Sequence, residues 1–145
     1  MKKGYSLAEL MVAVAIVALM ATISVASLSS YLKRESLASN AAALANAIRE
    51  ARSRTLASIK GQQYGVQVDS DRFTLFSGPA LSSTTADAPY LFASGVRAST
   101  AVPVVLFSRV TGNSSASGTI DLYIVGDPAK KRTVSVQGTG LVNLY

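Results

Sequence analysis

An uncharged, apolar stretch near the amino terminus constrains this chain more than any other feature. From Leu10 to Leu28, nineteen residues pass without a charge, a proline or a glycine. A helix of about 20 such residues spans the hydrocarbon core of a bilayer. One carboxylate, Glu9, directly precedes the stretch, and two lysines and a glycine occupy residues 2–4. We therefore predict a transmembrane helix over residues 5–28 with a basic flank and a single acid near its start.

Glu9 is expected to have a partner, because it lies at the start of an apolar helix. A carboxylate near the middle of a membrane helix costs roughly 2.5–3.5 kcal/mol, so acids in such segments usually pair or serve a function. If Tyr5 were the first residue of the processed chain, its ammonium would lie four residues before Glu9, on the same helical face. Glu9 could then neutralise its own amine in part or take the amine of a neighbouring subunit. A solvated carboxylate at headgroup level is the simpler alternative.

The amino-terminal residues resemble a known processing site. Lys2-Lys3-Gly4, then Tyr5-Ser6-Leu7-Ala8-Glu9 and the apolar run, is similar to the start of type IV prepilins and type II secretion pseudopilins. The resemblance implies that prepilin peptidase cleaves after Gly4 and N-methylates Tyr5, and that Glu9, the fifth mature residue, acts in assembly. Tyr5 stands where phenylalanine is most usual, but the aromatic ring is kept.

A conventional secretory signal is the competing interpretation of this amino terminus. It would end at a small-residue site, with candidates around Ala21–Ala26, after an apolar stretch of about 7–15 residues. The apolar run here is longer and leads directly into more predicted helix. We therefore favour the prepilin interpretation over signal-peptide removal.

The composition excludes several kinds of chemistry. The chain has no cysteine and no histidine, which removes disulfides, Cys/His zinc sites and Ser-His-Asp triads. No Ser-x-x-Lys motif opens a helix, and Asp69-Ser70-Asp71 lacks the further acids of a calcium loop. The net charge of +6 does not by itself indicate nucleic acid. We expect no catalytic residue, no cofactor, no metal and no enzymatic activity.

One long helix is predicted to continue beyond the membrane segment. Neither proline nor glycine occurs from Tyr5 to about Ile59, and Gly61 offers a stop. We therefore predict that residues 29–60 form an amphipathic helix that continues the spine, with Glu50 and Arg54 pairing at i, i+4. Its apolar stripe recurs at spacings of four and three, which indicates packing against a sheet. The stripe contains Leu37, Ala41, Leu44, Ile48, Ala51 and Thr55.

Beyond residue 60 the apolar period changes to two, which predicts β-strands. The residues around Tyr64–Val68 and Phe73–Leu75 flank a turn and predict a hairpin, whereas residues 126–131 predict a turn. Six or seven strands are expected in one small antiparallel sheet domain over residues 61–145, which makes the fold class α+β. The later strands are predicted at Tyr90–Ala93, Val104–Ser108, Thr119–Val125, Thr133–Val136 and Leu141–Tyr145.

The outer part resembles the GspH/FimT-type minor pseudopilins and minor pilins. The similarity lies in Ala47–Ser53 at the helix end, Val66 and Val68 in a hairpin, Leu106-Phe107 before Gly112, and the Gly140–Val142 ending. It implies a type IV pilin-like fold, in which the long helix packs on the sheet. Two departures are Ala26, where many members have proline, and the absence of arginine near the closing glycine.

A basic triplet, Lys130-Lys131-Arg132, is the weak candidate for a DNA contact. Lysine and arginine supply most of the sequence-independent affinity for DNA phosphates, but a solvated hairpin turn explains the triplet better. Arg49, Arg52 and Arg54 could extend a basic patch, although Arg52 lies close to the packing stripe and could snorkel from the helix–sheet interface.

These features predict a minor pilin or pseudopilin, an initiating or tip subunit of a type IV pilus or a type II secretion pseudopilus. We expect a single-pass inner-membrane protein with a periplasmic or extracellular carboxyl-terminal domain, which later enters the fibre. The expected partners are prepilin peptidase, other subunits bound through the amino-terminal helix, and the inner membrane. The alternatives are a DNA-binding minor pilin for DNA uptake and a membrane-anchored periplasmic module that does not assemble.

Overall fold

The computed structural model describes residues 6–80 and 86–145, with the backbone alone for residues 22–27. The predicted leader, residues 1–4, and Tyr5 lie outside the described residues. The chain divides into two compact units, Met1–Arg34 and Glu35–Tyr145. We call them unit 1 and unit 2 and describe each by itself.

The first element, helix α1, spans Leu7–Leu56. It begins after Ser6, whose Oγ accepts a hydrogen bond from the backbone N–H of Glu9 at 3.2 Å. This bond satisfies one of the free N–H groups of the first helical turn. Serine followed three residues later by glutamate is a capping-box pattern, and an acid in the first turn also favours the helix dipole. Among the described residues, no helix combines the length and hydropathy expected of a membrane span.

The helix ends earlier than the sequence predicted. It stops at Leu56 instead of near residue 60, and a short 3₁₀ helix, η1 (Ile59–Gly61), follows. The reason is a tertiary contact at Thr55, whose Oγ1 donates to the Ala51 carbonyl at 2.8 Å and accepts the Tyr64 N–H at 2.9 Å. Because this bond holds the first strand beside the last helical turn, the chain has to reverse within a few residues.

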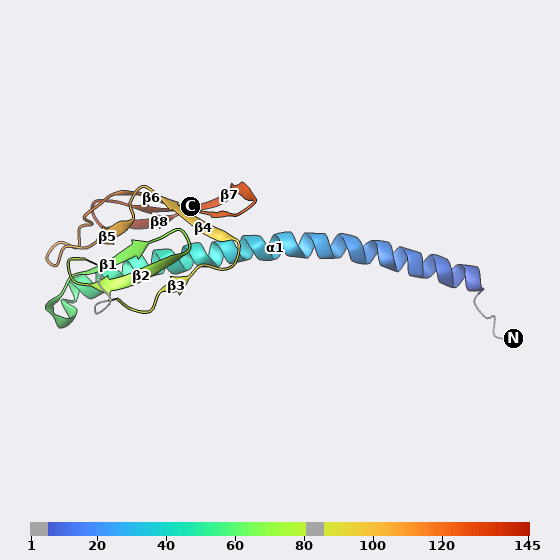
Figure 1. The fold of residues 1–145 in the computed structure, drawn as a ribbon, viewed down its shortest axis with the longest axis horizontal. Coiled ribbons are helices and arrows are strands. Elements are labelled where there is room, and N and C mark those ends of the chain that lie inside the picture. The colour runs from blue at the N-terminus through green and yellow to red at the C-terminus, as the bar shows by residue number, and fades with distance from the viewer. Residues whose placement is uncertain (1–5, 81–85) are drawn as a thin grey trace. The chain divides into compact units, whose positions relative to one another are not determined.

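The described part of the chain holds eight strands in two four-stranded sheets, ordered β3-β2-β1-β5 and β4-β6-β7-β8. Every strand pairing is antiparallel. Figure 1 shows the strands gathered alongside the part of α1 that belongs to unit 2. The strands are β1 (Tyr64–Val68), β2 (Arg72–Ser77), β3 (Tyr90–Leu91), β4 (Val96–Thr100), β5 (Val104–Leu106), β6 (Gly118–Ile124), β7 (Asp127–Val136) and β8 (Val142–Leu144).

The α+β class, the antiparallel pairing and the β1–β2 hairpin are confirmed, whereas the expected six or seven strands are too few, since the described residues form eight strands in two sheets. Strand β4 was missed, because it has only Val96 and Ala98 as its buried residues and so carries a weak apolar alternation. It pairs with β6, and this pairing places it in the second sheet instead of extending the first.

The turn predicted over residues 126–131 is also wrong. Strand β7 begins at Asp127, which pairs with Ile124, so the chain reverses at Val125 and Gly126. A register shift between Tyr123 and Ile124 accompanies this tight reversal, and Gly126 has a φ of 92°. Proline is tolerated near the first residue of a strand and next to a bulge, which is where Pro128 lies.

One hydrophobic core joins α1 to both sheets within unit 2. All six residues of the predicted helical stripe are at most 4% exposed, so the stripe is confirmed. Val105 of β5 and Phe107, which directly follows β5, belong to the same core cluster as Ile120, Leu122 and Val134 from the second sheet. The buried residues of the helix include three alanines, namely Ala41, Ala45 and Ala51. Their small side chains allow the strands to pack close to the helix.

Candidate functional site

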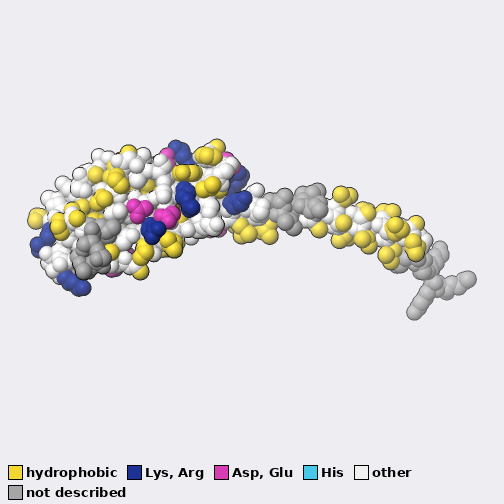
Figure 2. Space-filling model, in the orientation of Figure 1, with side chains coloured by type: hydrophobic (Ala, Val, Ile, Leu, Met, Phe, Trp, Pro, Cys, Tyr) yellow, Lys and Arg dark blue, Asp and Glu magenta, His cyan; other side chains and the backbone are white. Residues whose placement is uncertain are grey.

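The first candidate site is the amino-terminal part of α1. Gly4 and Tyr5, the predicted processing residues, lie outside the described residues, and Glu9 is exposed in the first helical turn. The large apolar side chains around and after it are more than half exposed, and Figure 2 shows hydrophobic side chains along the visible face of unit 1. They are Leu7, Leu10, Met11, Val12, Val14, Ile16, Val17, Leu19 and Met20. An apolar surface of this extent marks contact with a membrane or a protein.

Ser6 was not among the residues singled out from the sequence. Its bond to the Glu9 N–H fixes the first turn of α1, and therefore the position at which the Glu9 carboxylate leaves the helix. The signal was present as Ser-x-x-Glu directly before an apolar run, which is a known helix-start pattern.

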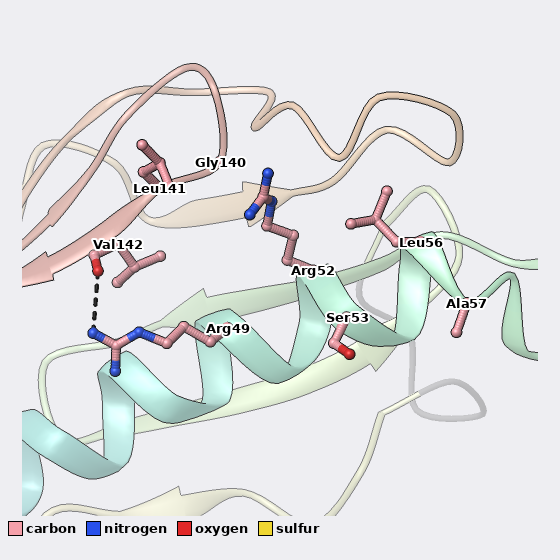
Figure 3. Close-up of a pocket in the computed structure, with 8 residues that line it drawn as sticks. All are labelled: Arg49, Arg52, Ser53, Leu56, Ala57, Gly140, Leu141 and Val142. Carbon is pink, nitrogen blue, oxygen red and sulfur yellow. Dashed lines mark hydrogen bonds between the residues drawn. The ribbon is translucent and has the colours of Figure 1, made fainter.

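The second candidate site is a pocket of about 490 Å³ in unit 2, between the last turns of α1 and the chain that enters β8. Figure 3 shows two arginines and several aliphatic side chains around it. The pocket is lined by Arg49, Arg52, Ser53, Leu56, Ala57, Gly140, Leu141 and Val142. Three of these residues form the Gly140–Val142 motif, which therefore lies in the pocket wall.

Arg52 ties two distant loops to the helix. Its Nε donates to the Gly112 carbonyl at 3.1 Å and its Nη2 donates to the Thr139 carbonyl at 3.2 Å. Gly140 has a φ of 79°, and a Cβ there would lie 2.2 Å from the Gly112 carbonyl oxygen and 2.7 Å from Arg52 Nε. We call Arg52, Gly112, Thr139 and Gly140 the Arg52 clasp. The clasp explains why a glycine is needed at position 140, and it was not predicted from the sequence.

Arg49 closes the other side of the pocket. Its Nη2 donates to the Val142 carbonyl at 3.1 Å, the bond drawn in Figure 3, and its Nη1 donates to Asn46 Oδ1 at 3.1 Å. The third arginine of the suggested basic patch is paired with carboxylates instead. Arg54 contacts Glu50 at 2.6 Å, as the sequence predicted, and Asp87 at 3.2 Å.

The basic triplet lies within β7 and not in a hairpin turn, contrary to the explanation favoured from the sequence. Lys130 Nζ lies 2.5 Å from Asp127, and Lys131 Nζ lies 2.8 Å from Asp121. Hydrogen bonds from Lys131 and then from the Thr133 hydroxyl lower the pKa of Asp121. Two of the three cations are therefore already paired with carboxylates on the same hairpin, whereas Arg132 makes no ion pair with a carboxylate of the described residues.

The amino-terminal residues of the chain match a known family. Residues 1–25 match the family model described as the prokaryotic N-terminal methylation motif. No curated protein sequence matches the chain significantly.

Among solved structures, the minor pseudopilin EpsH from the type 2 secretion system of Vibrio cholerae superposes with a TM-score of 0.59 at 14% identity, over 75% of this chain and 95% of that one. The type IV minor pilin FimU of Pseudomonas aeruginosa gives 0.61 at 20% identity, over 79% and 92%. The chain thus combines the prokaryotic N-terminal methylation motif with the type IV pilin-like fold of minor pilins and minor pseudopilins.

Proposed function

We propose that this chain is a minor pilin or pseudopilin subunit that prepilin peptidase cleaves after Gly4 and methylates on the amine of Tyr5. The observation that carries the proposal is the exposed apolar side of α1, headed by Glu9, on a chain whose residues 1–25 match the methylation motif. A minor role fits the small globular unit, its lack of cysteines and the likeness of its fold to a minor pilin and a minor pseudopilin.

Before assembly, residues 5–28 cross the inner membrane once, and the globular unit faces the periplasm or the outside. The support is the nineteen-residue stretch without a charge, and the exposure of its described large side chains. In the fibre these side chains pack against the helices of other subunits and exchange lipid contacts for protein contacts. The role is structural and needs neither a catalytic residue nor a cofactor.

Glu9 aligns neighbouring subunits in this proposal. The amine of Tyr5 is generated by cleavage, and the Glu9 carboxylate of one subunit takes the amine of the next. Leaving either charge unpaired away from water would strongly destabilise the assembly. The pairing therefore selects the one axial offset between subunits at which the carboxylate and the amine meet. The Ser6 cap supports this role because it holds the first turn at a defined position.

DNA uptake is not proposed. Lys130 and Lys131 are paired with Asp127 and Asp121, so within the part of the chain that the structure describes Arg132 is the triplet's cation left for a phosphate. The fibre of this proposal is a type IV pilus or a type II secretion pseudopilus.

The test is the mass of the amino-terminal peptide from chain produced together with prepilin peptidase. We expect a peptide that begins at Tyr5 and carries one methyl group, and we expect Gly4→Ala to abolish it. Gly138→Ala is the matched control, because no atom lies within 4 Å of a Cβ at that position. An intact Met1, or cleavage near Ala26, would refute the proposal and favour an anchor that does not assemble or a secreted domain.

A further inference from the structure

The pocket between α1 and β8 holds two positive charges that no described carboxylate neutralises. The five ion pairs found among the described residues of the chain involve Arg54, Arg72, Lys130 and Lys131, and neither pocket arginine. Arg49 and Arg52 instead donate to neutral oxygens. A guanidinium has five N–H donors, and each of these two uses two of them in those bonds. Donors and positive charge therefore remain for an acceptor that enters the pocket.

Apart from Ser53 and Gly140, the remaining lining residues of the pocket are aliphatic. Leu56 is 45% exposed and Leu141 is 51% exposed, although both line the pocket. Apolar walls with a few well-placed polar groups are typical of ligand sites, and a volume of about 490 Å³ falls in their usual range. The combination suits a group that is negatively charged at one end and aliphatic beside it.

The pocket is held in place before any partner arrives. The Arg52 clasp fixes the Gly140 loop to the helix, and the bond from Arg49 to the Val142 carbonyl fixes the start of β8. Because β8 is the edge of its sheet, its outer side could otherwise accept an added strand. The Arg49 bond blocks that edge at Val142, so the pocket admits a side chain instead of a strand.

We infer that this pocket binds a glutamate or aspartate side chain, flanked by an aliphatic residue, from a partner protein. The carboxylate meets the free donors of Arg49, and the aliphatic neighbour packs on a leucine of the pocket lining. Arginine and carboxylate form strong, geometrically specific pairs. Within the proposed function this partner is a neighbouring subunit of the fibre, and only that identification rests on the proposed function.

The test uses the full chain, labelled with ¹⁵N, in detergent micelles. The probe is the peptide acetyl-Leu-Glu-Leu-amide, and the control is its glutamine counterpart. We expect the Glu peptide to shift the amide signals of Gly140, Leu141 and Val142, and we expect the Gln peptide to bind about tenfold more weakly, which is the loss of one charge-assisted contact.

Variants separate the pocket from general charge. Arg49→Gln should weaken the binding of the Glu peptide about tenfold. Arg49→Lys keeps the charge but loses the planar guanidinium that can bind a carboxylate through two N–H groups, so it should give an intermediate loss. Arg97→Gln is the control, because Arg97 is exposed on β4, does not line the pocket, and donates a hydrogen bond to the carbonyl of its neighbour Val96. Retained signals elsewhere in unit 2 show that each variant folds.

Three outcomes would overturn the inference: equal affinity for the two peptides, unchanged affinity in Arg49→Gln, or tighter binding of inorganic phosphate with the same signal shifts. The last outcome would assign the pocket to phosphate groups. Because the measurement requires neither cleavage nor assembly, its result is independent of the amino-terminal mass that tests the proposed function.

Discussion

Replacing Gly140 by alanine is the most direct test of the structural role assigned to the Arg52 clasp. Gly140 has a φ of 79°, in the left-handed region, and a Cβ at this position would lie 2.2 Å from the Gly112 carbonyl oxygen. Real Cβ atoms do not approach a carbonyl this closely, so the loop has to move. The same movement pulls the Thr139 and Gly112 carbonyls away from the guanidinium of Arg52.

The expected loss of stability has two parts. Holding a residue other than glycine in the left-handed region costs about 1–2 kcal/mol. A hydrogen bond to a charged group contributes about 1.5–3 kcal/mol, and the low end applies because the contacts of Arg52 are partly exposed to water. Together they predict a decrease of about 3 kcal/mol in the free energy of unfolding of unit 2, or on the order of 15 °C in Tm for a domain near 100 residues.

Urea unfolding of the full chain, followed through the amide signals of unit 2, measures this decrease. Gly138→Ala is the control two residues away, where nothing lies within 4 Å, and we expect it to change stability by less than about 0.5 kcal/mol. In a double-mutant cycle, Arg52→Ala should cost much less in the Gly140→Ala background than in the wild type, because both changes break the same contacts. A Gly140→Ala chain as stable as the control, or additive effects in the cycle, would refute the clasp.

Three further predictions concern single side chains. Thr55→Val removes the hydroxyl that accepts the buried Tyr64 N–H and should lower the free energy of unfolding by about 1–3 kcal/mol, measured by urea unfolding; no loss would contradict this role. Since the bond from Lys131 lowers the pKa of Asp121 in the folded state, its stabilising effect is present above the unfolded pKa and is lost as pH falls through the folded value. The stability advantage of wild type over Asp121→Asn should therefore shrink below about pH 4, and a constant advantage would refute the assignment. Glu9→Gln should leave the processed mass normal but reduce recovery of the subunit in sheared fibres, whereas unchanged recovery would contradict the proposed pairing.

The features that the sequence predicted well depend on residues that are close together in the chain. The buried stripe of α1 follows from a spacing of four and three, which places its members on one face of any α-helix. The β1–β2 hairpin follows from two alternating runs around Asp69–Asp71, and the methylation motif is a contiguous stretch within residues 1–25. The Ser6 cap was equally local and was overlooked.

The remaining features depend on contacts between residues that lie far apart in the chain. The sequence does not show that β4 pairs with β6, because antiparallel strands of similar composition can pair in many orders and burial of the whole core selects among them. The helix end shifted to Leu56 because Thr55 bonds to Tyr64, nine residues away.

The amino-terminal motif, the helix and its buried face were determined by the sequence alone, because backbone geometry turns local spacing into a surface. The pocket was decided by the tertiary structure. Arg52 bonds to the carbonyls of Gly112 and Thr139, and every residue has a carbonyl, so nothing in the sequence marks those two as partners. They become partners only when the packed sheets bring both loops against the last turns of α1.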